Sequence, residues 1–235
     1  MEFVTIGLNV GEGVGKMTSN KLSVIIPTMW KPYFIIETLV SLQKCDYVDE
    51  ILVISNASGF VAPMPKLSKL TIIETGINHY VNPSWNVGYL LAKNDKLMFL
   101  NDDLSFDFST YLPIISKHII PANGMIGLHE TCYKKEPDKF DILAMNKLTY
   151  GYACVFFIHK NRYSLIPNDM KIYHGDTWLF NKTKRQNFGL TGIKLDGIMS
   201  LTSNEKEFKS IEQRDINLWN TIYMKLSENN NENIS

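Results

Sequence analysis

A run of three polar residues, Asn101, Asp102 and Asp103, follows directly after the apolar segment 96–100. Two adjacent carboxylates at a strand end repel each other unless a cation or hydrogen bonds neutralise them. Mg²⁺ and Mn²⁺ prefer such hard oxygen ligands and bridge readily to phosphates. The run therefore predicts a divalent metal site. The simpler alternative is a polar turn that caps the next segment.

The elements that position this run follow from the apolar pattern of the first half. Buried strands are predicted at residues 22–27, 50–55, 70–74 and 96–100, and helices at 33–43 and 86–93. Continuous apolar strands that alternate with helices indicate a parallel sheet covered on both faces. Ligands bind beyond the carboxyl ends of such strands. We therefore expect Thr28, Asn56 and residues 101–103 to face one crevice.

The second half is less regular. Short strands are predicted at residues 125–128 and 152–158, the start of a helix at 177–181 and a closing amphipathic helix at 208–226. We expect an N-terminal extension over residues 1–20, a single domain over 21–226 and a flexible tail over 227–235.

Composition limits the classes of function. Lys+Arg and Asp+Glu both count 24, so no overall basic field favours nucleic-acid binding. The three cysteines show neither a zinc spacing nor a disulfide framework, which suits a reducing cytoplasm. We expect no membrane span, because the chain has no apolar run of about 18 residues. We expect no signal peptide either, because residues 1–10 lack a positive n-region and a sustained apolar stretch.

Residues 11–18 look like a phosphate-binding loop. The Walker motif requires a glycine where Val10 stands and a Ser or Thr where Met17 follows the lysine. Both requirements fail, so nucleoside-triphosphate hydrolysis is not expected.

Five short elements, taken in order, resemble the motifs of family 2 glycosyltransferases. They are Pro27-Thr28, Ser55-Asn56-Ala57-Ser58, Asn86-Val87-Gly88, Asn101-Asp102-Asp103, and the strand from Gly151 followed by His174-Gly175-Asp176-Thr177-Trp178. The resemblance covers about residues 21–180, and its specificity lies in the ordered set. It implies a GT-A fold, an α/β architecture with a mostly parallel, Rossmann-like sheet flanked by helices. Residues 21–103 would then form the nucleotide-sugar-binding half and 104–226 the acceptor half.

The resemblance also implies roles for individual residues. Those implied for the donor nucleotide are Pro27, Thr28, Asn56, Asn86 and Asp102. Asp103 would be the direct ligand of Mn²⁺ or Mg²⁺, and Asp176 the base that takes a proton from the acceptor hydroxyl. Further sugar or acceptor contacts would come from Gly151, Trp178, Lys184 and Arg185.

The implied activity is transfer from a nucleoside diphosphate sugar, by default a UDP-sugar, with inversion at the anomeric carbon. The acceptor stays open between a glycan, a protein and a hydroxymethylated DNA base. The Lys/Asn/Ile-rich composition also suits a viral enzyme, which would act in the host cytoplasm. Two positions depart from the family pattern, because Asn56 and Asn101 replace aspartates, and residues 198–204 lack the late histidine that often completes the metal shell.

Other interpretations remain for these residues. Asp176 is also placed to cap a helix, Trp178 to lie in the core, and the cluster of Lys182, Lys184 and Arg185 to form a solvated loop. The alternative functions are a nucleotidyltransferase and a non-catalytic sugar- or nucleotide-binding domain of the same fold. A nucleotidyltransferase would need a glycine-rich loop after the first strand, which residues 27–31 lack.

Overall fold

The computed structural model describes residues 20–57, 64–135, 139–197 and 208–232, with residues 223–232 described by their backbone only. Three parts of the sequence interpretation lie outside these residues. They are the predicted extension up to residue 19, Ser58 of the second motif, and the segment 198–204 that lacks a histidine.

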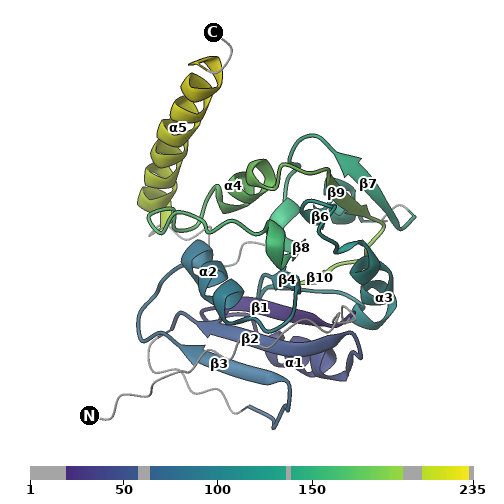
Figure 1. The fold of residues 1–235 in the computed structure, drawn as a ribbon. Helices are drawn as coiled ribbons and strands as arrows, with labels where there is room; N and C mark the ends of the chain where they lie inside the picture. Colours follow the sequence, from purple (N-terminus) through teal and green to yellow (C-terminus); the bar gives the residue numbers. More distant parts are fainter. Residues whose placement is uncertain (1–19, 58–63, 136–138, 198–207, 233–235) are drawn as a thin grey trace, which may run out of the picture.

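A central sheet dominates the described part of the chain (Figure 1). In spatial order its eight strands are β3 (Leu70–Glu74), β2 (Val48–Ser55), β1 (Leu22–Thr28), β4 (Lys96–Leu100), β8 (Val155–His159), β6 (Ile126–Leu128), β9 (Asn187–Thr191) and β7 (Asp141–Met145). The first four are parallel, and β6 and β9 are also parallel. β8 runs antiparallel to β4 and β6, and β7 closes the far edge antiparallel to β9. The predicted mostly parallel α/β sheet is confirmed.

Helices cover both faces of the sheet because its strands are apolar on both sides. Val24 and Ile26 of β1 belong to the core on the side of α1 (Ile35–Lys44) and α3 (Phe108–His118). Ile25 points to the opposite core, which includes side chains of α2 (Val81–Leu91) and α4 (Gly175–Lys182). This alternation is the two-residue period of a strand, and it explains why the strands read as unbroken apolar runs.

The remaining elements are short, except for the last helix. The 3-10 turns η1 (Glu130–Tyr133) and η2 (Tyr152–Cys154) lie between strands, and η3 (Lys160–Arg162) lies between β8 and α4. β5 (Leu104–Ser105) pairs with β10 (Asp196–Gly197). α5 (Lys209–Glu232) begins against the body and runs outward from it (Figure 1). The predicted closing helix is confirmed, but its backbone stays helical to Glu232, through most of the predicted tail.

Several boundaries differ from the sequence interpretation for local reasons. α2 begins five residues before the predicted start at 86, and it holds Pro83 in its first turn, where no intrahelical N–H bond is lost. The predicted strand 152–158 begins as a 3-10 turn, so β8 starts only at Val155.

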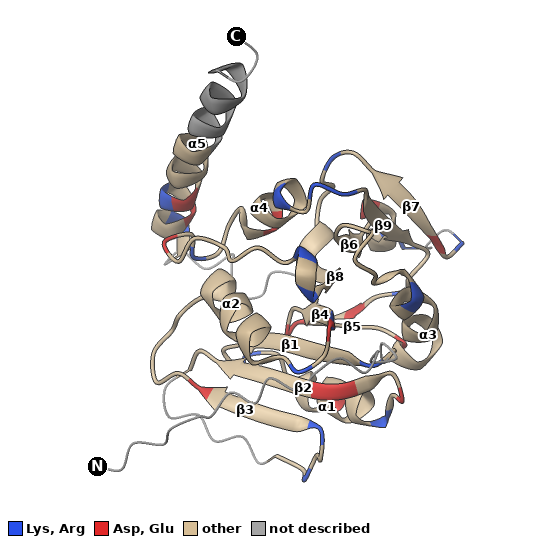
Figure 2. Ribbon diagram, in the orientation of Figure 1, with Lys and Arg blue, Asp and Glu red and all other residues tan. Residues whose placement is uncertain are grey.

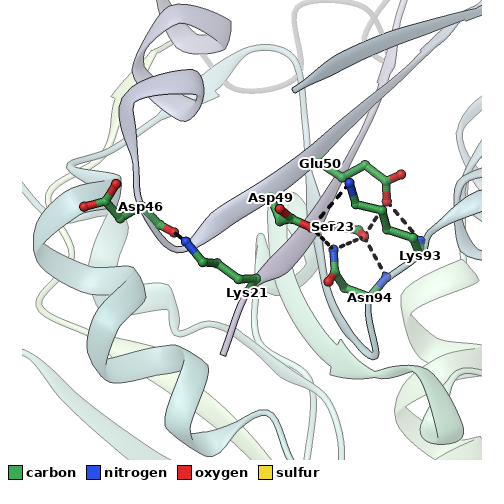
Figure 3. A network of polar contacts seen from close by, with 7 residues as sticks. All are labelled: Lys21, Ser23, Asp46, Asp49, Glu50, Lys93 and Asn94. Atoms are coloured by element: carbon green, nitrogen blue, oxygen red, sulfur yellow. Dashed lines mark hydrogen bonds and ion pairs between the residues drawn. The ribbon is translucent and has the colours of Figure 1, made fainter. Parts of the chain in front are cut away.

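A polar network fixes the amino ends of the central strands (Figure 3). Ser23 Oγ of β1 donates to Glu50 Oε2 of β2 over 2.5 Å, and Asn94 Nδ2 donates to Ser23 Oγ over 3.0 Å. Lys93 Nζ pairs with Asp49 Oδ2 at 3.3 Å. The network therefore joins β1, β2 and the turn before β4 at the end of the sheet opposite to the carboxyl ends.

Charged residues of both signs are interspersed along the described elements (Figure 2). None of the helices in the described ranges combines the length and the apolar composition that a bilayer crossing requires.

Candidate active site

Two adjoining pockets lie beyond the carboxyl ends of the parallel strands. The first, here called the strand-end pocket, is lined by the ends of β1, β2 and β4 and by the start of α2; its residues include Pro27, Thr28, Met29, Asn56, Asn78, Tyr80, Asp102 and Phe208. The second, the helix-start pocket, is lined by Asn101, Gly151, Tyr173, His174 and Asp176 among others. Val81 and Ile172 line both, so the pockets are neighbours, and the pair is here called the trough.

The trough has two unequal parts. The cavity volumes of the strand-end pocket and the helix-start pocket are about 80 Å³ and 230 Å³. The expected crevice at the strand ends is present, and it brings Pro27, Thr28, Asn56 and Asp102 together.

Asp102 provides the carboxylate of the strand-end pocket. Thr28 Oγ1 donates to Asp102 Oδ2 over 2.6 Å, and the same hydroxyl oxygen accepts from the backbone N–H of Trp30 over 2.7 Å. Burial raises the pKa of Asp102 to about 6; the Thr28 hydrogen bond opposes the rise and the neighbouring Asp103 charge adds to it. The carboxyl therefore lies at the wall of the pocket, where a bound cation would favour its ionised form.

Asp103 lies in the interior of the turn between β4 and β5. Its exposed fraction is 5% and it does not line the strand-end pocket. Asp102, in contrast, lines the strand-end pocket, and the metal role of Asp103 stays a prediction.

The amide of Asn56 holds the loop that leads into α2. Its Oδ1 accepts from the backbone N–H of His79 over 3.1 Å, and its Nδ2 donates to Ser84 Oγ over 3.1 Å. Asn56 thus lines the pocket and also shapes the wall that Tyr80 and Val81 form.

Asn86 and Gly88 make contacts that hold α2 in place. Asn86 Nδ2 donates to the Ile166 carbonyl over 2.8 Å, and its Oδ1 accepts from Ile166 N and Tyr163 Oη, each over 3.0 Å. A Cβ on Gly88 would lie 2.3 Å from Ile25 Cγ2 of β1. The Asn-x-Gly motif therefore anchors α2 to its neighbours, and Asn86 lines neither pocket.

Asp176 lines the helix-start pocket from the first turn of α4. Its Oδ1 accepts from the N–H of Thr177 over 2.7 Å and from the Thr177 hydroxyl over 3.3 Å. Burial raises the pKa of Asp176, while the bonds from Thr177 and the nearby His174 oppose the rise. A carboxylate with a raised pKa is a stronger base than a free aspartate, so the position suits proton abstraction.

Backbone conformation is strained around the trough. Trp30, Tyr80 and His174 have φ values of 61°, 67° and 60°. Left-handed conformations in bulky residues cost about 1–3 kcal/mol and cluster at functional sites. Tyr80 and His174 line the pockets, and Trp30 follows the β1 strand end.

A family model described as glycosyl transferase family 2 matches residues 23–188, more than half of the chain. The chain belongs to this family. Its fold is the GT-A fold, as the resemblance implied.

One solved structure agrees with the family fold. Staphylococcus aureus TarS, as the fragment 1–349, matches with a TM-score of 0.52 and 14% identity, over 73% of this chain and 59% of that chain. Lower scores come from a longer TarS structure (TM-score 0.48, 16% identity, 73% and 36% covered) and from the Pyrobaculum calidifontis mannosyltransferase PcManGT in complex with GDP-Man and Mn²⁺ (0.41, 20%, 48% and 36%). A search of curated proteins found no match.

The resemblance implies a divalent metal, and the residues of the trough can be compared with the ligands that such an ion requires. No group of three or more His, Cys, Asp or Glu side chains in the described residues is arranged to hold a metal ion. The Cys154 thiol stays protonated, since burial raises its pKa to about 11. Mg²⁺-type ions, however, are often held by one or two carboxylates together with substrate phosphates. Asp102 fits that mode, with the diphosphate supplying the remaining oxygens.

The other predicted contacts divide between the pockets and the far side of α4. Gly151, with φ of 69°, lines the helix-start pocket. Trp178 Nε1 donates to the Leu165 carbonyl over 3.1 Å, and Lys182 Nζ lies 4.6 Å from the Trp178 ring centroid, so this ring lines neither pocket. Lys184 and Arg185 line a separate hollow beyond the C-terminal end of α4. The eight residues of α4 span about 12 Å, so the structure keeps this pair away from Asp176.

Two residues near α5 were missed by the sequence interpretation. Phe208 lines the strand-end pocket and meets Tyr80 edge-on, with ring centroids 6.2 Å apart. Asp215 has an exposed fraction of 0%. Helical spacing carried a signal for Asp215, because it shares one stripe with Ile211, Leu218, Trp219 and Ile222. An aspartate within an apolar stripe has a buried partner.

Proposed function

We propose that the chain transfers a sugar from a nucleoside diphosphate sugar to an acceptor hydroxyl with inversion, with Asp176 as the general base. The observation that carries the proposal is the shared trough. The carboxylate of Asp102 lies at the strand ends where a diphosphate would bind, and the carboxylate of Asp176 lies in the adjoining pocket.

In this mechanism the donor nucleotide occupies the strand-end pocket. Thr28 and Asp102 contact its ribose and diphosphate, and Tyr80, Val81 and Phe208 form the apolar part of the wall. Asp102 would hold Mn²⁺ or Mg²⁺ together with the diphosphate, and the bound metal would stabilise the negative charge on the departing group.

The acceptor enters the helix-start pocket. Asp176 takes the proton of the acceptor hydroxyl while that oxygen attacks the anomeric carbon. The new C–O bond forms as the old bond to the diphosphate breaks, and the nucleoside diphosphate leaves with the bonding electrons. The raised pKa of Asp176 favours this transfer, because it brings the base closer to the operating pH.

The finer assignments are also proposals. We propose a UDP-sugar as donor, a hexose or pentose as the transferred group, and a glycan, a protein or a hydroxymethylated DNA base as acceptor. Residues 21–103 would bind the donor and residues 104–226 the acceptor. The described cysteines form no disulfide, which supports a reducing cytoplasm as the place of action.

The test is Asp176→Asn. We expect turnover to fall by about 10²–10⁴-fold, because the amide cannot accept the proton, while donor binding changes little. Release of nucleoside diphosphate from UDP- and GDP-sugars is measured with panels of glycan, protein and hydroxymethylated DNA acceptors. Asp141→Asn, at an exposed carboxylate of β7, is the matched control and should leave turnover unchanged. Equal turnover in parent and Asp176→Asn would remove Asp176 from the mechanism.

A further inference from the structure

The segment 171–173 lines the two pockets and leads to Asp176, the base proposed above. Ile172 lines both pockets, Tyr173 lines the helix-start pocket, and three residues after Tyr173 the chain reaches Asp176. The segment belongs to no helix or strand. Its position must therefore be fixed by contacts from neighbouring elements.

One set of contacts comes from a single buried carboxylate on α5. The backbone N–H groups of Lys171, Ile172 and Tyr173 all donate to Asp215, at distances to the nearest carboxylate oxygen of 3.0, 2.7 and 3.0 Å. Successive N–H groups that converge in this way form a concave anion site. Here the anion is the Asp215 side chain, and its burial is balanced by these donors.

A second set comes from Asn82 in the first turn of α2. Its backbone N–H donates to the Lys171 carbonyl over 2.9 Å, and its Nδ2 donates to the Tyr173 carbonyl over 3.2 Å. The N–H groups of the segment are thus held by α5 and two of its carbonyls by α2. Asn82 also lies against the start of α4, since a Cβ on Gly175 would be 2.1 Å from Asn82 Oδ1.

Other contacts of α5 reinforce the same segment. The His174 ring stacks on Trp219, with centroids 5.7 Å apart and planes 8° apart, and Arg214 donates to the Asp169 carbonyl over 2.9 Å. Figure 1 shows the base of α5 beside the chain that leads into α4. All of these residues of α5 lie beyond residue 188, where the family match ends.

We infer that Asp215 is a positioning residue for catalysis, which fixes segment 171–173 and thereby aims Asp176 at the acceptor. This inference rests on the proposed function of Asp176. Because Asp215 does not line the pockets, it acts through the backbone and not on the substrate. α5 is accordingly part of the active site and not an appendage.

The experiment compares Asp215→Asn and Asp215→Glu with the parent. In Asp215→Asn, the new side chain places an NH₂ donor against the backbone N–H groups of the segment. Hydrogen exchange of the backbone amides at residues 171–173 should therefore accelerate. A displacement near 1 Å costs up to about 100-fold in rate, so we expect kcat to fall by about 10- to 100-fold. The donor KM should change less than about threefold, because the polar donor contacts lie on the strand ends. Glutamate keeps the carboxylate and should recover part of kcat and of the exchange protection.

Glu212→Gln is the matched control, since it removes a charge from an exposed position one turn earlier on α5. It should leave exchange and kcat at parental values. Faster exchange at residues 171–173 with parental kcat would overturn the inference. So would unprotected amides at these positions in the parent, a measurement that holds even if neither Asp215 variant folds.

Failure of the proposed function would look different. The parent would transfer no sugar and bind no nucleotide sugar, while the amides of residues 171–173 would be protected in the parent and exposed in Asp215→Asn. In that case Asp215 holds the segment, but this does not serve glycosyl transfer. Loss of kcat in Asp176→Asn with parental kcat in Asp215→Asn would keep the proposed function and remove Asp215 from it.

Discussion

Asp102 occupies a position that is unfavourable for folding and useful for binding. Its carboxyl is largely withdrawn from water and lies next to Asp103, and its pKa is raised to about 6. In the unfolded chain an aspartate titrates near pH 4. Between these values the folded state holds more protons than the unfolded state, so the free energy of unfolding decreases as the pH rises.

We therefore predict that Asp102→Asn stabilises the unliganded protein at neutral pH by about 1–2 kcal/mol. The gain should be absent below about pH 4, develop up to about pH 6 and stay constant above it. Urea denaturation at several pH values measures it. A gain that is the same at every pH would exclude ionisation of Asp102 as its cause.

The same residues show what sequence can and cannot reveal about a site. Residue types and their order drew attention to Asp102 and Asp176, which both line pockets, because strand ends and helix starts are readable from apolar patterns. The sequence did not show which of Asp102 and Asp103 lines the strand-end pocket, since the turn geometry decides which of two adjacent side chains faces it. Asp215 was not identified because its partners are backbone groups about 42 to 44 residues away.

At the scale of elements, close approach of α2 to β1 determines how the loop at Tyr80 meets the strand ends. Gly88 permits this approach, since the space for a Cβ is filled by the side chain of Ile25. Helix and strand would have to move apart to accommodate any larger residue.

We predict that Gly88→Ala destabilises the fold by about 1–3 kcal/mol, the usual cost of overpacking. The double variant Gly88→Ala with Ile25→Ala should lose less than the sum of the two single variants, because the shortened side chain makes room for the methyl group. Denaturant unfolding of the four proteins measures the coupling. Strict additivity would show that the two residues do not compete for the same space.

The elements that the sequence did not reveal have physical reasons for being missed. α3 holds Pro113 in its interior, which normally argues against a helix. β9 includes Asn187 and Gly189, and β7 is largely exposed, so neither has the apolar character of a buried strand. Their pairing partners stabilise them, and a single sequence does not contain that tertiary information.

At the scale of the whole molecule, the trough is assembled from both ends of the chain. The strand ends lie within the first 102 residues, whereas Ile172 and Phe208 close the same pocket from the second half. A ligand in the strand-end pocket would therefore join distant parts of the chain and stabilise the folded state as a unit.

We predict that a nucleoside diphosphate with Mn²⁺ raises the melting temperature. At a concentration 100 times its Kd, a ligand adds about 2.7 kcal/mol, which corresponds to about 5–10 °C for a protein of this size. UDP, GDP and CDP are compared with Mn²⁺ and with EDTA, and Asp102→Asn is the control that should lose the metal-dependent part. No shift with any of them would favour a non-catalytic domain.

The network at the amino ends of the strands has a consequence for evolution. Ser23, Glu50 and Asn94 secure the alignment of β1, β2 and β4 at one end of the sheet (Figure 3). The pocket residues stand at the opposite end. Substitutions of Met29 or Asn78 would therefore change the lining of the strand-end pocket without disturbing strand alignment. Because strand alignment and pocket lining depend on different residues, the pocket can change by single substitutions while the sheet stays intact.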